Sequence, residues 1–541
     1  MKKHNAIKVI LVTTFICAIL TWIFKAAYFQ SEFVDQGLVQ MGLFDLFSYS
    51  LTSLSYFGYI ALYMICVGGF YGILNKIPAY HKLVSSISNK MSKHSIVWLS
   101  VIMILIGIIT SVCGLQLGLI LFFPFVATVV LLMGYDKIVV ALTLVGSSMA
   151  GIIGTTTGYS NVGLLNSYLG TDVTNNTSLK IAILIVALFL VILNTVLYIR
   201  RNNKVVSVKK VEKVNEESIK EEKIKVVEVK KSDSSKDNTT KTKDANKKAT
   251  KTSSKPSTKT TKKNSSKKSS SKSKNNNKAA VLDEEVIMIK NKKFDNKLKV
   301  WPLIVGLLIL FIIMILAFIP WSDVFGFTGM ATASESVNGF EIFKFALFGK
   351  LLGSFNTFGD WMITDMFLPM ACVIILLAII YKVKIDDLFD GFADGAKKAL
   401  LPALTSLLIY VVLVINTYHP FQLTFYKAIL GIGGTSKLNV FTTAFTAILS
   451  SLFNVEPSYA FQAFIPYLTS LITNQDVYPV IGIISQAMYG FTMIFAPTSV
   501  VLMAVISALE IRYKDWLKAI WKLLVELLVV LLIIFTIIIL L

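Results

Sequence analysis

Two segments of the chain place glycine, hydroxyl and amide residues inside stretches that are otherwise apolar. They span residues 146–161 and 486–499. A helix interrupted at membrane depth leaves backbone N–H and C=O groups unpaired, and these can hold a substrate carboxylate and a coupling cation, respectively. We therefore expect a substrate and ion site built from both segments. The candidate ligands are Gln116, Ser147, Gly151, Gly154, Thr155, Thr156, Thr157, Ser160, Asn161, Gln486, Gly490, Thr492, Pro497, Thr498 and Ser499.

Close helix packing is the competing interpretation of both segments, because small residues also let membrane helices approach one another. Three consecutive threonines, Thr155-Thr156-Thr157, followed by Gly158, Ser160 and Asn161, favour a site in the first segment. In the second, Pro497 frees a carbonyl group at depth. A buried amide would be costly against lipid, so Gln116 should face a partner or a cavity.

The apolar runs contain no residue pattern that is typical of an enzyme active site. They contain no paired carboxylates, histidine clusters or Ser/His/Asp pattern. The four cysteines show no CxxC or Cys/His spacing, so neither a zinc site nor a disulfide framework is indicated. We expect no enzyme activity, no metal centre and no cofactor. Scarce buried carboxylates favour Na⁺ or exchange over proton coupling, because proton coupling normally needs an ionisable group.

The elements that position these residues are membrane helices. Of 541 residues, 55% are hydrophobic and only 16% charged, and the mean hydropathy is +0.67, which excludes an ordinary soluble protein. Residues 201–299 carry 30 Lys and Arg against 13 Asp and Glu, so most of the net charge of +21 belongs to this segment. Its Lys/Ser/Thr/Asn-rich tract has no aromatic residue from 203 to 280, which predicts a disordered linker that binds no nucleic acid. A tether to anionic lipid is the alternative.

Apolar runs near the length that crosses a bilayer appear on both sides of this linker. We predict an all-α polytopic protein of the cytoplasmic membrane with about 11–13 membrane segments. The expected parts are a first transmembrane repeat (1–200), a cytoplasmic linker (201–298) and a second repeat (299–541). Lys and Arg in short loops place the N-terminus inside, and the C-terminus then lies outside.

The two repeats resemble each other in the order of their motifs. Phe70-Tyr71-Gly72 in the first half corresponds to Gly391-Phe392-Ala393-Asp394-Gly395 in the second, and Thr155-Thr156-Thr157 corresponds to Pro497-Thr498-Ser499. Such repeats are the usual construction of secondary transporters, which hold substrate near the midplane. A third interruption, residues 431–436, is either a re-entrant tip or an external loop.

At these motifs the chain resembles the DcuC/YfcC family of C4-dicarboxylate and amino-acid carriers, within the ion transporter superfamily. Pro124 leads to Gly134-Tyr135-Asp136, as in the family, and residues 486–499 match a Gln-x-Gly-Asp-Gly-Phe-Thr-Asn-x-Ile-x-Pro-Thr-Ser pattern. The chain departs from that pattern at Met488-Tyr489 and at Met493, where the family has Gly-Asp and Asn.

The resemblance implies re-entrant hairpins at 113–134 and 420–453, an elevator-type movement of a transport domain against a scaffold, and a homodimer. Because no Lys or Arg lies deep in an apolar run, we expect an amino acid or small peptide as the substrate, with a carboxylate second. The alternatives are a C4-dicarboxylate exchanger and a degenerate, non-transporting membrane component.

Overall fold

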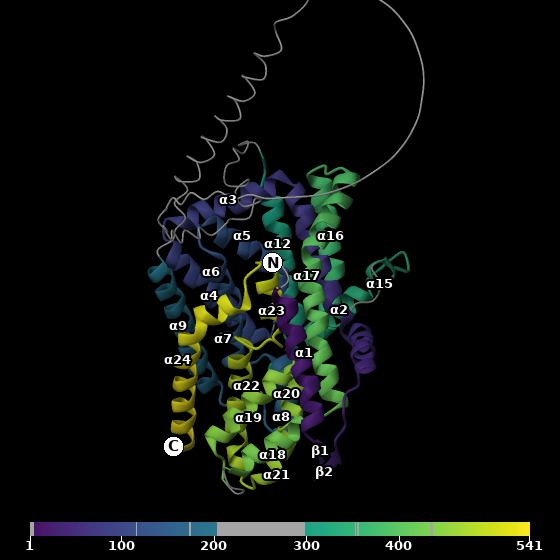
Figure 1. Ribbon diagram of the computed structural model, residues 1–541. Coiled ribbons are helices and arrows are strands. Elements are labelled where there is room, and N and C mark those ends of the chain that lie inside the picture. Colours follow the sequence, from purple (N-terminus) through teal and green to yellow (C-terminus); the bar gives the residue numbers. More distant parts are fainter. Residues whose placement is uncertain are drawn as a thin grey trace, which may run out of the picture. The chain divides into compact units, whose positions relative to one another are not determined.

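The computed structural model describes residues 5–202 and 298–540, except 115, 173–174, 352, 354–355 and 433–436, and it is almost entirely helical (Figure 1). The side chains of residues 159–161 and 351 are also outside the described part. Within these ranges the strands form only two short hairpins, β1 (Ala26–Gln30) with β2 (Glu32–Gly37) and β3 (Glu341–Ile342) with β4 (Phe345–Ala346). The expected linker lies outside the described residues, so its structure remains a prediction.

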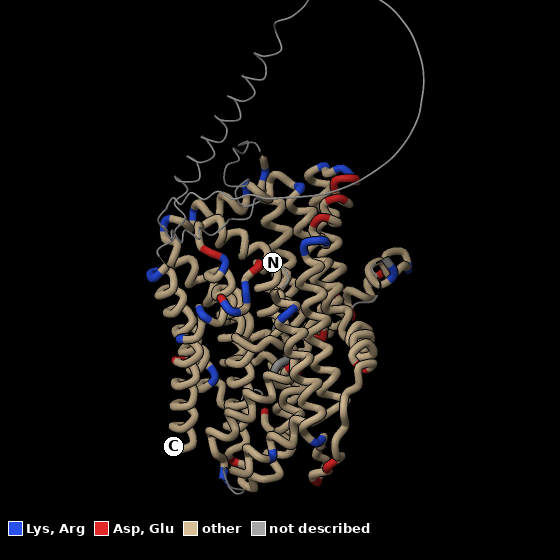
Figure 2. Tube along the Cα trace, in the orientation of Figure 1, with Lys and Arg blue, Asp and Glu red and all other residues tan. Residues whose placement is uncertain are grey.

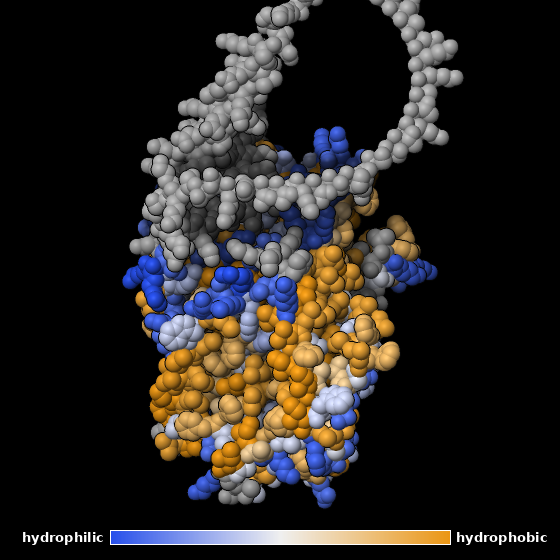
Figure 3. All heavy atoms as spheres, viewed as in Figure 1, coloured by the Kyte–Doolittle hydropathy of each residue, from blue (hydrophilic) through white to orange (hydrophobic). Residues whose placement is uncertain are grey.

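Eight helices of the described residues are long and apolar enough to cross a bilayer, which confirms the polytopic all-α fold. Their apolar side chains form a broad band on the face seen in Figure 3, between more polar ends. Lys and Arg gather mostly at the end that contains α3 (Pro78–Ser92), as Figure 2 shows. The eight are α1 (Asn5–Ile23), α2 (Leu43–Lys76), α4 (Ser95–Cys113), α9 (Thr177–Asn202), α12 (Trp301–Phe318), η3 (Ile363–Met366) continued by α16 (Phe367–Ile380), α17 (Ile385–Tyr418) and α24 (Tyr513–Leu540).

The helices α2 and α17, of 34 residues each, pack against each other. They cross through glycines in the first pair of repeat motifs. A Cβ atom added to Gly72 would lie 2.0 Å from the Gly391 carbonyl oxygen. One added to Gly395 would lie 2.0 Å from the carbonyl oxygen of Gly68. The two motifs therefore pack against each other, because only glycine permits this backbone approach.

Each repeat contains a helical hairpin. In the first, α4 ends at Gly114, whose φ of 67° suits glycine, and the chain returns through η1 (Gly118–Leu121) and α5 (Phe123–Leu132). The two ends meet, because the Tyr135 hydroxyl donates to Ser95 Oγ at 2.9 Å. In the second, α19 (Val440–Phe453) is followed by α20 (Pro457–Gln462) and α21 (Ile465–Leu471), and Ser450 Oγ donates to the Ala460 carbonyl oxygen at 2.6 Å.

The hairpin boundaries expected from the resemblance are wrong. The segment 113–134 contains only the tip and the returning arm of the first hairpin, because α4 is its outgoing arm. The segment 420–453 joins a separate helix, α18 (Gln422–Ile432), to the outgoing arm of the second. Of the third interruption, residues 433–436 lie outside the described part.

One further helix per repeat is broken, as predicted. In the first repeat, α6 (Lys137–Ala141), the π-helical turn η2 (Leu142–Gly146) and α7 (Ser147–Ile153) form one arm, and α8 (Tyr159–Leu169) follows after residues 154–158. In the second, α22 (Tyr478–Met493) and α23 (Val500–Ala508) are separated by residues 494–499. The apolar run at 479–509 is therefore two helices rather than one span.

Candidate substrate site at the crossing of two broken helices

The first break, residues 154–158, is held by the C-terminal turn of α4. Ser111 Oγ donates to the Gly154 carbonyl oxygen at 2.7 Å. Thr156 N donates to the Ser111 carbonyl oxygen at 3.1 Å, and Thr157 Oγ1 donates to the Val112 carbonyl oxygen at 2.9 Å. The end of α4 thus supplies hydrogen-bond partners to backbone and side-chain groups of the break, which lipid could not do.

The second break, residues 494–499, is paired in a related way. Thr498 Oγ1 donates to the Leu452 carbonyl oxygen at 3.0 Å, near the tip of the second hairpin. Ser499 caps α23 by accepting from Leu502 N at 3.4 Å. Trp516 Nε1 donates to the Ile494 carbonyl oxygen at 3.0 Å. In both repeats, a threonine of the broken helix therefore binds carbonyl groups of the hairpin's outgoing arm, which supports the predicted correspondence of 155–157 with 497–499.

The two broken helices cross where Gln486 and Gly490 of α22 face the end of α7. Gln486 Nε2 donates to the Thr155 carbonyl oxygen at 2.9 Å. A Cβ atom on Gly490 would lie 2.6 Å from the Ile153 backbone nitrogen. Gln486 therefore joins residues that are 331 positions apart in sequence, and Gly490 allows the close approach.

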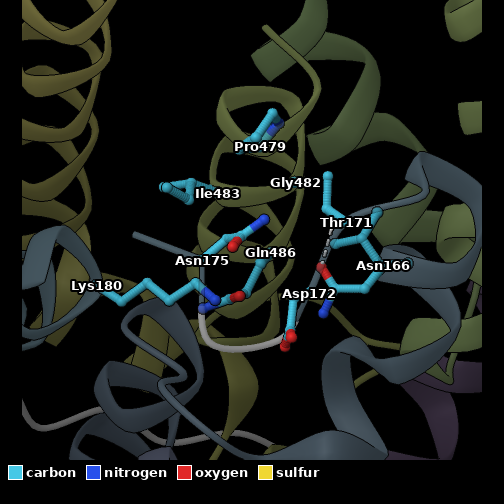
Figure 4. Close-up of a pocket in the computed structure, with 10 residues that line it drawn as sticks. Asn166, Thr171, Asp172, Asn175, Lys180, Pro479, Gly482, Ile483 and Gln486 are labelled. Atoms are coloured by element: carbon cyan, nitrogen blue, oxygen red, sulfur yellow. Dashed lines mark hydrogen bonds between the residues drawn. The ribbon is translucent and has the colours of Figure 1, made fainter. Parts of the chain in front are cut away.

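A pocket adjoins this crossing (Figure 4). Gln486 lines it together with the first turn of α22, the end of α8 and the start of α9. Lys180, whose residue is only 5% exposed, also lines it, and its side chain extends toward Gln486 in Figure 4. Asp172 is close enough to interact electrostatically with Lys180. Sequence analysis found no Lys or Arg deep in an apolar run, and it did not anticipate that Lys180, in the first turn of α9, is buried beside Gln486.

Asn166 adds a second donor to the pocket wall. Its Oδ1 atom accepts from Thr171 Oγ1 at 3.0 Å, which fixes the amide orientation. Its Nδ2 atom is buried and has no hydrogen-bond partner among the described residues. An unpaired buried N–H donor is costly, so a ligand that accepts a hydrogen bond here would be favoured.

Several predicted ligands have other roles in this structure. Ser147 and Thr492 donate to carbonyl groups one turn earlier in their own helices, those of Thr143 and Met488. Gly151 and Gly154 serve close packing: a Cβ atom on Gly151 would lie 2.4 Å from the Gly107 carbonyl oxygen. A Cβ atom on Gly154 would lie 2.5 Å from the Leu184 Cα atom. At these two glycines the packing interpretation holds.

The remaining predicted ligands are spread around the crossing. Gln116 lies at the tip of the first hairpin and is half-buried, and its side chain makes a hydrogen bond with Tyr489 of α22. The backbone of residues 160 and 161 belongs to the first turn of α8. The Ser160 and Asn161 side chains lie outside the described part, so their role remains a prediction.

Sequence analysis missed Lys180, Asn166 and Glu456. Lys180 lies in the first turn of a predicted span, a position usually taken as interfacial; its neighbours Asp172 and Asn175 were the available signal. Glu456 lies before Pro457, between two short apolar runs. It was missed because the expected boundaries of the second hairpin ended at residue 453, before its tip.

Comparison with known proteins gives one family. The model of the C4-dicarboxylate anaerobic carrier family, DcuC, matches residues 4–246 and 240–541, that is, almost the whole chain in two segments. No curated protein and no solved structure matches the chain.

Proposed function

The chain belongs to the C4-dicarboxylate anaerobic carrier family, and from this premise we propose that it is a secondary carrier that moves four-carbon dicarboxylates across the membrane. The substrate would bind beside the crossing of α7 and α22, where the pocket has space for about one water molecule in this conformation and would have to widen to admit a diacid. Neither an enzyme activity nor a cofactor is part of this proposal.

The observation that carries the proposal is the buried cation in the pocket. A carboxylate leaves water only where a cation, hydrogen-bond donors or a helix N-terminus replace its hydration. Lys180 supplies the cation, and Asn166 supplies an amide N–H donor, whereas the Nε2 group of Gln486 is already bound to the Thr155 carbonyl oxygen. This set suits an anionic substrate better than the neutral amino acid or peptide expected from the sequence.

The start of α22 adds a further favourable feature for an anion. Pro479 and Gly482, in the first turns of this 16-residue helix, line the same pocket. Backbone N–H groups at a helix N-terminus carry a partial positive charge. Pro479 has no N–H group and Gly482 lies in the second turn, so the start of α22 would act on an anion through the helix dipole and not through a free N–H donor.

The transport step that we propose is alternating access. The two hairpins hold the two broken helices through equivalent threonine contacts, so each hairpin would gate one side. The elevator-type movement and a homodimer belong to the resemblance and are proposals for this chain. Na⁺ as the coupling ion was expected from the scarcity of buried carboxylates.

Counterflow in proteoliposomes tests the substrate class. Vesicles loaded with unlabelled succinate should accumulate radiolabelled succinate, and external fumarate or malate should compete, whereas neutral amino acids and dipeptides should not. Accumulation of an amino acid but not of succinate would overturn the dicarboxylate proposal. Silence toward every solute, from protein with a cooperative unfolding transition, would favour the non-transporting alternative.

A further inference from the structure

A carboxylate lies at the tip of the second hairpin and has no role in the pocket. Glu456 precedes Pro457, the first residue of α20, and its side chain accepts a hydrogen bond from the Tyr410 hydroxyl of α17. Tyr410 is completely buried. Glu456 therefore joins the hairpin to one of the two long helices that cross through glycines.

The titratable groups that face Glu456 are tyrosines. Tyr410 of α17, Tyr59 of α2 and Tyr489 of α22 all interact with its charge. The helices α8, α19, α20 and α21, which belong to or pack against this hairpin, contain no Asp, Glu, Lys, Arg or His. The helices α17, α18 and α24 also contact α19 and do carry charged residues, among them the exposed Lys427 of α18. Among the described residues, Glu456 forms no ion pair.

A carboxylate in such surroundings is costly while it is charged. Glu456 is partly exposed. The Tyr410 hydroxyl stabilises its carboxylate by a hydrogen bond, but among the described residues no cation pairs with it, and a charged group within a membrane domain is expensive unless it is paired or neutralised. Binding a proton removes the charge. Membrane carboxylates of this kind commonly serve as proton carriers in pumps and transporters.

Glu456 also lies where the two hairpin tips are connected. The Tyr489 hydroxyl donates to the carbonyl oxygen of Val455, the preceding residue, at 2.9 Å. The same tyrosine makes a hydrogen bond with Gln116, at the tip of the first hairpin. A change of charge at Glu456 would therefore alter its interactions with α17 and α22. Through Tyr489 it would also affect the contact with the tip of the first hairpin.

We propose that Glu456 binds the coupling proton of transport, and that its protonation weakens the attachment of the second hairpin to α17. The proton leaves water on one side, neutralises the carboxylate and is released on the other side after the hairpin has moved. The hydrogen bond from Tyr410 is charge-assisted only while Glu456 is ionised. Coupling would thus be to protons rather than to the Na⁺ that the sequence favoured.

Infrared difference spectroscopy of the reconstituted protein tests proton binding without any substrate. A step from about pH 8 to about pH 5 should produce a carboxylic-acid C=O band in the native protein and in Asp476→Asn, which removes an exposed carboxylate at the start of α22. The band should lose intensity in Glu456→Gln, which leaves only the contribution of ordinary Asp and Glu residues that are partly protonated at this pH. Identical spectra for the native protein and Glu456→Gln would overturn the proposal.

Two further variants make the test specific. Tyr410→Phe should keep the band but move its appearance to higher pH, because the ionised carboxylate loses a donor while the acid does not. A purely structural role of Tyr410 would leave that pH unchanged. Should Glu456→Gln fail to fold, Glu456→Asp should shift the frequency of the band, and an unshifted band would assign it to another residue.

The transport experiment for Glu456 rests on the proposed function. The measured quantity is the ratio of two rates, succinate uptake driven by a pH gradient and succinate counterflow. This ratio should fall to background in Glu456→Gln and stay at the native value in Asp476→Asn. An unchanged ratio in Glu456→Gln, or a native uptake that follows a Na⁺ gradient at equal pH, would overturn proton coupling at Glu456. If the native protein shows no succinate counterflow, the proposed function fails, while the infrared result still decides the proton site.

Discussion

Replacement of Lys180 by glutamine tests the pocket most directly. The substitution keeps a polar side chain of similar length but removes the cation. We expect Lys180→Gln to weaken succinate binding strongly while leaving the fold intact, because a neutral side chain is easier to bury than an ammonium group. Lys180→Arg, which keeps the charge but changes its shape, should weaken binding less.

The expected size follows from the burial of Lys180. At 5% exposure its interaction with a carboxylate is poorly screened by water, so the value for a hydrogen bond to a charged group applies, about 1.5–3 kcal/mol. That corresponds to a Kd ratio of about 10- to 150-fold. A larger value is not expected, because Asp172 already balances part of the charge.

Equilibrium binding of radiolabelled succinate to the purified protein, read by scintillation proximity, measures this ratio. Lys427→Gln is the matched control, because Lys427 is exposed on α18 and its Nζ atom lies 3.8 Å from the Phe33 ring centroid, outside the pocket. The native Kd should be retained in the control. Equal affinities in Lys180→Gln and the native protein would refute the assignment of Lys180 as the carboxylate partner.

Other perturbations address the scaffold and the linker. Gly490→Ala should lower the free energy of unfolding by about 1–3 kcal/mol, because its Cβ would meet the α7 backbone; Gly482→Ala, which meets only a leucine methyl group, should cost less, and calorimetry in detergent compares them. Gly72→Ala should prevent the close crossing of α2 and α17, so a normal yield of folded protein would contradict that packing. The pKa of Asp35 is lowered by the Gly37 N–H group and Lys25, so its contribution is present at neutral pH and is lost as the pH falls through the lowered pKa; the unfolding temperature of Asp35→Asn should depend less on pH below about pH 4. Deletion of residues 205–285 should leave succinate counterflow intact, because the residues on both sides belong to one structural unit; loss of counterflow with normal insertion would refute a pure linker role.

The positions of the breaks were predictable because a membrane imposes a local rule. Every backbone group in a bilayer must be paired, so glycine, proline and hydroxyl residues inside an apolar run identify the places where a helix is interrupted. The breaks at 154–158 and 494–499 follow this rule. The glycines of the α2 and α17 crossing were named from the sequence only as repeat motifs, and their contact with each other is a finding of the tertiary structure.

The sequence by itself determined the class of protein, its repeats and the breaks, because hydropathy and residue size act over short stretches of chain. The tertiary structure alone decided which polar groups meet. Gln486 reaches Thr155, and Glu456 reaches Tyr410 of another helix. Lys180 looked interfacial in the sequence, and it becomes a pocket residue only because α8 and α22 cover it. Burial and partners depend on contacts between distant segments, and those contacts convert an ordinary lysine or glutamate into a candidate site.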